Sequence, residues 1–158
     1  MYVIHRKQDT ERDISQFIAI GCEVIEPIKS IIISNSLVKT HISILQKDKN
    51  DVIIFEDDAD IKDDKFLNEI DKEYDIIYFG VNCEFLNAYK FNLSYGTHSM
   101  YISSKGKEKF LKFLSMQSSN YTKYRPIDII WNDVVMKMDL KVKRLHLITT
   151  KNYKSTNS

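Results

Sequence analysis

Three consecutive carboxylates, Glu56, Asp57 and Asp58, are the residues of this chain best suited to chemistry. They directly follow residues 52–55, which are all β-branched or aromatic. An apolar run of this kind is typical of a strand buried on both faces of a parallel sheet. Because unpaired charge is too costly to bury, the acids are expected where the strand leaves the interior, at its carboxyl end.

That position suits a ligand site, since open α/β sheets bind ligands at the carboxyl ends of their strands. Clustered carboxylates repel one another unless a cation or a shared proton relieves them. A hard divalent ion, Mn²⁺ or Mg²⁺, is the simplest partner for such a set of oxygen ligands. The alternative interpretation is a solvated acidic turn without a function.

The composition indicates one globular domain. The chain has 158 residues, of which 43% are hydrophobic and 28% charged, so a full core fits and a second domain does not. We assign residues 1–150 to the domain and 151–158 to a polar tail. The first residues lack the apolar core of a signal peptide, and no apolar run is long enough to span a bilayer. These features, with two distant cysteines, favour a cytoplasmic protein, and Lys-, Ile- and Asn-rich usage favours a bacterial or viral source.

Charge is unevenly distributed along the chain. The formal net charge is only +1, which argues against a general nucleic-acid binder. Residues 48–75 nevertheless carry twelve acids against four lysines, whereas residues 137–158 carry six bases against one acid. An acidic edge facing a basic segment would suit a metal–diphosphate ligand, because phosphates need cations. Two solvated faces of opposite sign are the alternative.

Apolar patterning and turn residues predict alternating strands and helices. This order indicates the α/β class with a mainly parallel central sheet. Residues 81–95 show no clean periodicity and are expected to form a loop or an irregular hairpin. Strands are expected near residues 2–5, 22–28, 52–55, 75–80, 95–103 and 140–149, and helices near 9–18, 36–47, 63–72, 105–114 and from Pro126 onward.

Several segments, taken in order, resemble glycosyltransferase family 25, which includes lipooligosaccharide β-galactosyltransferases and collagen galactosyltransferases. The likeness runs from about residue 3 to about residue 149, although the chain is short for the family and Thr40 replaces a serine. The segments are Val3-Ile4 with Glu11-Arg12, Leu37-Val-Lys-Thr-His41, Ile53-Ile-Phe-Glu-Asp-Asp-Ala59, Asp75-Ile-Ile-Tyr-Phe-Gly80, Gly96-Thr-His-Ser-Met-Tyr-Ile-Ser103 and Pro126-Ile-Asp128.

The resemblance implies a GT-A-like fold, that of nucleotide-diphospho-sugar transferases, and transfer of a sugar from a UDP-sugar. The sugar would be galactose and the transfer inverting. The acceptor would be a hydroxyl of a glycan, a lipid-linked molecule or a protein. A divalent ion would neutralise the charge that develops on the UDP diphosphate.

The same resemblance suggests roles for individual residues. Asp58 would ligate the metal, as the last acid of an Asp-x-Asp motif does. Asp57 would ligate or orient, and Glu56 would contact the ribose or the donor sugar. Inversion also needs a general base for the acceptor hydroxyl, and Asp128 is the candidate. The alternative role of Asp128 is that of a helix cap, since it follows Pro126.

Four further residues complete the candidate set. Arg12 and Thr97 would contact the donor, although Arg12 could equally cover its own helix with its stem. His98 would bind a hydroxyl or brace the Gly96 turn. His146 would reach the metal, as a late histidine does in several GT-A enzymes. His41 belongs to one of the segments that resemble the family, so a functional role is possible for it. Because it lies on the apolar side of its expected helix, the alternative is a hydrogen-bonded histidine with a structural role.

Two other functions compete with the transferase. The first is a shortened domain of the same fold that binds a nucleotide-sugar or a partner without turnover. The second is a phosphotransfer receiver, which would need an acidic pair after the first strand, where His5 and Arg6 stand. An EF-hand at residues 58–69 is excluded, because its sixth position is not glycine.

Overall fold

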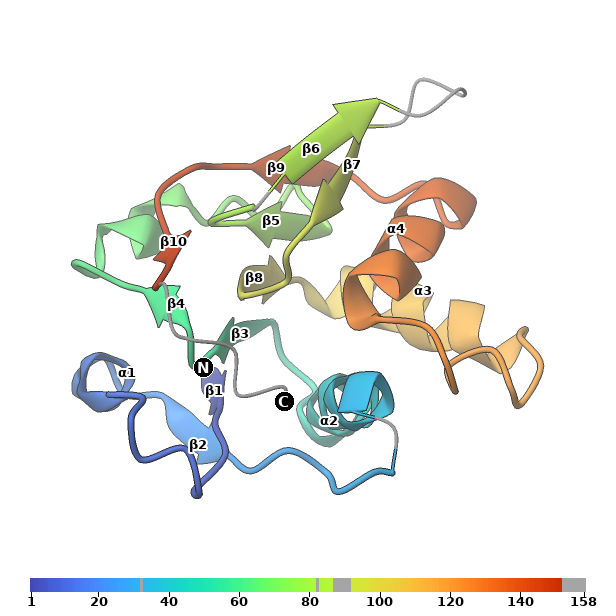
Figure 1. Cartoon of the computed structure of the whole chain (residues 1–158). Helices are drawn as coiled ribbons and strands as arrows, with labels where there is room; N and C mark the ends of the chain where they lie inside the picture. Colours follow the sequence, from blue (N-terminus) through green and yellow to red (C-terminus); the bar gives the residue numbers. More distant parts are fainter. Residues whose placement is uncertain (32, 82, 87–91, 152–158) are drawn as a thin grey trace.

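A mixed six-stranded sheet is the framework of the protein (Figure 1). The computed structural model describes residues 1–151 apart from 32, 82 and 87–91. Strand β8 runs antiparallel to both of its neighbours, whereas the other five strands run in one direction. The prediction of an α/β domain with a mainly parallel sheet is confirmed. The strand order is β2 (Glu23–Ile25), β1 (Tyr2–Ile4), β3 (Val52–Glu56), β8 (Ser99–Ile102), β5 (Ile76–Tyr78) and β9 (Val142–Arg144).

Side chains alternate along each central strand and fill two separate cores. In β3, Val52 and Ile54 enter one core, and Ile53 and Phe55 enter the other. None of these four is more than 7% exposed, which confirms that β3 is buried on both faces. Helices α2 (Ile33–Lys47), α3 (Ser104–Ser115) and α4 (Ile127–Lys137) cover the first face, and α1 (Ser15–Ala19) and the 3₁₀ turn η1 (Lys65–Glu69) cover the second.

Two small strand pairs stand beside the main sheet. Strand β4 (Ala59–Asp60) pairs antiparallel with β10 (Thr149–Thr150). Strands β6 (Cys83–Leu86) and β7 (Asn92–Tyr95) also pair antiparallel, in agreement with the hairpin alternative for residues 81–95. The expected polar tail falls, after Lys151, outside the described residues.

Two of the predicted helices are much shorter than expected. Within residues 9–14 only Thr10 and Glu11 form a turn and none is helical, and the Oδ1 atom of Asp13 accepts the Ser15 N–H at 2.9 Å. In the region 63–72 only η1 forms, after Asp63 accepts the Lys65 N–H at 3.0 Å. The cause is the same in both places, because an Asp side chain that binds a nearby N–H favours a turn over a regular helix. The helix expected at 36–47 begins earlier, at Ile33.

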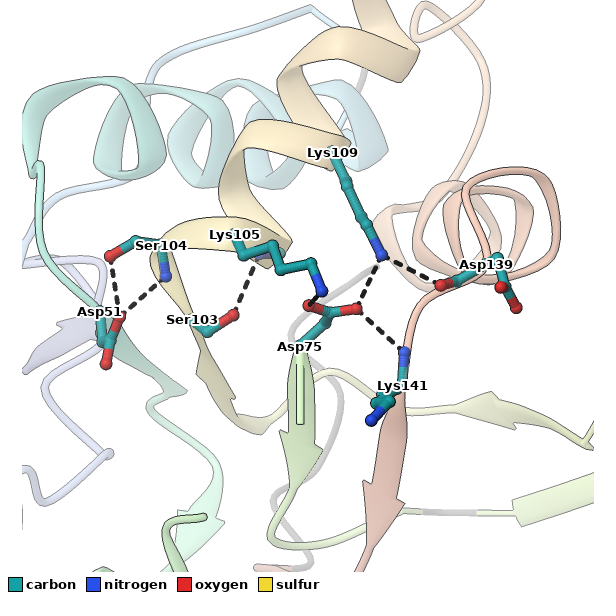
Figure 2. Close-up of polar contacts among 9 residues, drawn as sticks. Asp51, Asp75, Ser103, Ser104, Lys105, Lys109, Asp139 and Lys141 are labelled. Carbon is teal, nitrogen blue, oxygen red and sulfur yellow. Dashed lines mark hydrogen bonds and ion pairs between the residues drawn. The ribbon is translucent and has the colours of Figure 1, made fainter. Parts of the chain in front are cut away.

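A polar network fixes α3 to the sheet edge opposite the three acids (Figure 2). Asp75 is 2% exposed, and its carboxylate accepts the Lys109 Nζ at 2.9 Å and the Lys141 N–H at 3.0 Å. Ser103 caps α3 by accepting the Gly106 N–H at 3.0 Å. These groups satisfy buried donors and acceptors where α3 begins. We therefore assign them a structural role.

No helix within the described ranges is long and apolar enough to cross a membrane. The longest, α2, has 15 residues.

Asp75→Ala is expected to lower the free energy of unfolding by about 2–4 kcal/mol, because the Lys109 ammonium and the Lys141 N–H lose their shared buried partner. Urea unfolding followed by circular dichroism measures the change. The matched control is Glu69→Ala, which breaks a more exposed 3.0 Å pair with Lys143 and should cost less than about 1 kcal/mol. Equal losses in the two variants would contradict the structural role of Asp75.

Candidate functional site

Strand topology brings the candidate residues to one edge of the sheet. Strands β1 and β3 are parallel, with Ile4 opposite Glu56, so their carboxyl ends coincide. Strand β8 is antiparallel to β3, and the segment that enters it therefore arrives at the same edge. The Glu56 N–H donates to the His98 carbonyl at 2.9 Å, which joins the two segments directly.

Asp57 is held by two partners. Its Oδ2 atom lies 2.9 Å from the Nδ1 atom of His5, and its Oδ1 atom accepts a hydrogen bond from the Arg12 guanidinium. The Asp57 side chain is almost fully buried. With both carboxylate oxygens engaged, Asp57 is placed to orient the acidic turn, which is one of the two roles considered for it.

Among the described residues, the Glu56 side chain has one hydrogen-bond partner, Thr97. The Thr97 hydroxyl donates to its Oε1 atom at 2.6 Å. Burial raises the pKa of Glu56 to about 7, the Thr97 hydrogen bond opposes this rise, and the carboxylates of Asp58, Asp57 and Asp128 add to it. A carboxyl group with this pKa can donate or accept a hydrogen bond near neutral pH.

Asp58 and His98 present atoms that have no partner in the described chain. The buried Oδ1 atom of Asp58 and the Nδ1 atom of His98 make no hydrogen bond there. Burial raises the pKa of Asp58 and lowers that of His98. The Nε2 atom of His98 lies 3.4 Å from the Ile148 carbonyl. Because a carbonyl only accepts, Nε2 carries the proton, and Nδ1 is left as an acceptor.

One cavity of about 240 Å³ is lined by Glu56, Asp58, Thr97 and His98. Asp128, at the beginning of α4, lines it as well, and its Oδ1 atom accepts the Ile129 N–H at 2.9 Å. Asp128 therefore lies in the first turn of α4, two residues after the N-cap residue Pro126, and at the cavity. The complete lining is Leu37, Glu56, Asp58, Gly96, Thr97, His98, Pro126, Ile127, Asp128 and Thr150.

The C-terminal segment forms a wall of the cavity. Its backbone follows the end of β5, where Leu147 and Ile148 donate N–H groups to the Phe79 carbonyl, and the Lys151 N–H donates to the Asp58 carbonyl at 2.7 Å. Gly80 permits this approach, because an added Cβ would lie 1.8 Å from the Ile148 oxygen. In its described part, the basic segment therefore does return to the acidic edge.

Not every candidate lies in this cavity. Arg12 is not part of its lining and donates a hydrogen bond to Asp57 instead. His146 lines a neighbouring cavity of about 220 Å³, which shares His98 and Thr150 with the first. His41 is fully buried, and its ring nitrogens have no hydrogen-bond partner in the described residues.

Sequence reasoning did not select His5 or Thr150 for the site. His5 follows the first strand directly, and that position was its one available signal, because parallel neighbours end at the same edge. Thr150 is placed by the pairing of β10 with β4, for which the sequence offers no comparable signal.

The donor set suits a divalent ion only in part. Within the described ranges, no group of three or more His, Cys, Asp or Glu side chains is arranged to hold a metal. Asp58 offers a buried carboxylate oxygen at the cavity that has no hydrogen-bond partner among the described residues. One carboxylate fits Mg²⁺ or Mn²⁺ where substrate phosphates and waters complete the shell.

Comparison with known proteins shows the fold. No protein-family model and no curated protein matches the chain. Among solved structures, A197 from STIV is similar, with a TM-score of 0.55 and 10% identity over 98% of this chain and 84% of that one. So is 4-diphosphocytidyl-2C-methyl-D-erythritol synthase from Anaerococcus prevotii, with a TM-score of 0.52 and 12% identity over 99% and 73%.

A protein from Bacillus anthracis assigned as a glucose-1-phosphate thymidylyltransferase has a TM-score of 0.51 and 11% identity, over 90% of this chain and 66% of that chain. Identities this low show the architecture alone. The chain has the GT-A-like fold of nucleotide-diphospho-sugar transferases.

The raised pKa of Glu56 gives a pH dependence that can be measured without divalent ions. Between pH 4.5, the ordinary pKa of Glu, and about pH 7, the unfolded chain loses this proton while the folded chain keeps it. Stability from this group should therefore fall as pH rises through that window and stay constant outside it. Relative to Glu56→Gln, which cannot titrate, the natural chain should lose roughly 2–3 kcal/mol across it. Urea unfolding at several pH values tests this, and a constant difference between the two proteins would contradict it.

Proposed function

We propose that the chain is a metal-dependent glycosyltransferase that moves a sugar from a UDP-sugar to a hydroxyl acceptor with inversion. One observation carries the proposal. Two distant parts of the chain, Glu56 and Asp58 at the end of β3 and Asp128 in the first turn of α4, line a single cavity at the carboxyl edge of the sheet. Carboxyl groups whose pKa is raised by burial in a cavity, as it is for Glu56 and Asp58, are typical of a functional site.

Asp128 is the proposed general base. Its carboxylate would accept the proton of the acceptor hydroxyl while the hydroxyl oxygen attacks the anomeric carbon of the donor. The bond from that carbon to the diphosphate breaks in the same step, and the leaving UDP keeps the electron pair. Proline at position 126 and the helix start fix the position of Asp128 at the cavity wall.

Asp58 is the proposed protein ligand of Mn²⁺ or Mg²⁺. When bound, the ion supplies positive charge to the diphosphate of the donor. Asp57 orients the acidic turn through Arg12 and His5. We expect His146, in the adjoining cavity, to be secondary to Asp58.

Glu56, Thr97 and His98 are proposed to bind sugar or ribose hydroxyls. A carboxyl group with a pKa near 7 and a histidine Nδ1 acceptor both suit hydroxyl partners, which donate and accept. That the sugar is galactose, and that the acceptor belongs to a glycan, a lipid-linked molecule or a protein, rests on the resemblance to glycosyltransferase family 25 alone.

A second candidate is binding of a nucleotide-sugar without turnover. Two observations favour it. The described residues include no group of three or more His, Cys, Asp or Glu side chains arranged to hold a metal, and both oxygens of Asp57 are already bound by Arg12 and His5. The two candidates differ in chemistry and share the ligand. The experiments therefore measure binding and turnover separately.

The first experiment is a thermal-shift screen of UDP-galactose, UDP-glucose, UDP-N-acetylglucosamine and UDP, each with and without Mn²⁺. Ligand at one hundred times its Kd stabilises the folded state by about 2.7 kcal/mol, so a clear rise in Tm is expected for the correct donor. The rise should require Mn²⁺. If no compound shifts the Tm under either condition, both candidates are contradicted.

The second experiment measures donor hydrolysis and transfer in three variants. Asp58→Asn should abolish the Mn²⁺-dependent rate, and Asp128→Asn should lower kcat by about 10²–10⁴ while donor binding persists. Asp64→Asn, at an exposed acid, is the matched control and should leave the rate unchanged. Unchanged turnover in folded Asp58→Asn would refute the proposed metal role, and binding without any turnover in the natural chain would favour the second candidate.

A further inference from the structure

A third and larger cavity lies between the ends of two helices, apart from the acidic edge. It occupies about 400 Å³ between the last turn of α3, the segment after it and the second half of α4. Figure 1 shows α3 and α4 as neighbours on one side of the sheet. Its volume falls within the range of small-molecule sites, about 300–1,000 Å³.

Aromatic and thioether groups form the apolar part of this cavity. Phe113 is buried, and its ring meets the Tyr121 ring edge-on with centroids 5.6 Å apart. Met138 is partly buried, whereas Met116 is 59% exposed. The two methionines therefore extend the apolar part of the lining from Phe113 to the surface. Methionine adapts readily to the shape of an apolar ligand.

The acid in this cavity is already neutralised. The Oδ2 atom of Asp133 accepts hydrogen bonds from the Tyr121 hydroxyl and from Arg125 Nη1, the latter at 2.9 Å. The Arg125 guanidinium also lies 4.7 Å from the centroid of the Tyr121 ring. This arrangement fixes the segment that precedes Pro126, so the cavity has one preformed wall.

Both cations of the lining are exposed, and Arg125 is paired with Asp133. Lys137 lies one helical turn after Asp133 on α4, and among the described residues it makes no ion pair within 4.0 Å. With Asp133 paired to Arg125, the lining carries one net positive charge beside an apolar floor. An ammonium on an apolar rim complements a ligand whose own charge is negative and whose body is apolar.

We propose that this cavity is a binding site for a small amphipathic anion. Its aliphatic or aromatic body would lie on Phe113, Met116 and Met138, and its carboxylate would pair with Lys137. The site is separate from the acidic cavity, since their linings share no residue. It does not depend on the proposed transferase activity.

The experiment uses octanoate as the probe and isotope-labelled methionine methyl groups as the readout. In NMR titrations of the full chain, the Met116 and Met138 methyl signals should shift saturably, while that of Met100, buried in the sheet, should not. Octanol, which lacks the charge, and acetate, which lacks the body, should each bind at least about tenfold more weakly. Absence of a saturable shift with octanoate would overturn the proposal.

Two variants test the charge. Lys137→Met should weaken octanoate about tenfold and leave octanol unaffected, because it removes only the ion pair. Lys112→Met, which removes a charge from α3 at a position outside the lining, is the matched control and should bind octanoate as the natural chain does. Equal octanoate affinity in the two variants, or octanol binding as tight as octanoate, would overturn the assignment of an anionic ligand.

Discussion

Burial of β3 on both faces is the constraint on which the rest of the structure depends. Its four apolar residues pack alternately into two cores, so no position of β3 can hold a charged side chain before the end of the strand. Glu56, Asp57 and Asp58 therefore lie together at the carboxyl end of β3. There they contact the other segments that reach the same edge of the sheet. The site is thus a consequence of packing, because the sheet determines where charge can first appear.

The antiparallel strand β8 decides which segments meet there. If β8 ran parallel to β3, the segment containing Thr97 and His98 would enter at the opposite edge, beside Asp75. Its reversal places Thr97 2.6 Å from Glu56 and His98 near Asp58. The same reversal puts Ser103 at the opposite edge, where it caps α3. One strand direction therefore separates the chemical edge of the sheet from its structural edge.

The sequence predicted what local composition controls. The run at residues 52–58 defined both the central strand and its acids, and Pro126 marked the start of α4. Contacts between residues far apart in the sequence could not be predicted from it. The contact of His5 with Asp57 spans 52 residues, and no periodicity encodes it. The shortening of α1 and η1 had a local cause, since Asp13 and Asp63 bind nearby N–H groups, and the pattern of apolar residues outweighed that signal in the prediction.

The four acids at this edge, Glu56, Asp57, Asp58 and Asp128, differ in the partners that the fold supplies to them. Asp57 receives Arg12 and His5, whereas Glu56 and Asp58 are desolvated with their pKa values raised. Desolvated acids beside one another reduce the stability of the folded chain, because at neutral pH each ionises less readily than in water. A fold that can supply an arginine to one acid could neutralise its neighbours in the same way. Leaving Glu56, Asp58 and Asp128 around an open cavity therefore favours a ligand that brings its own positive charge or hydroxyl donors, and this is the physical basis for a site at this edge.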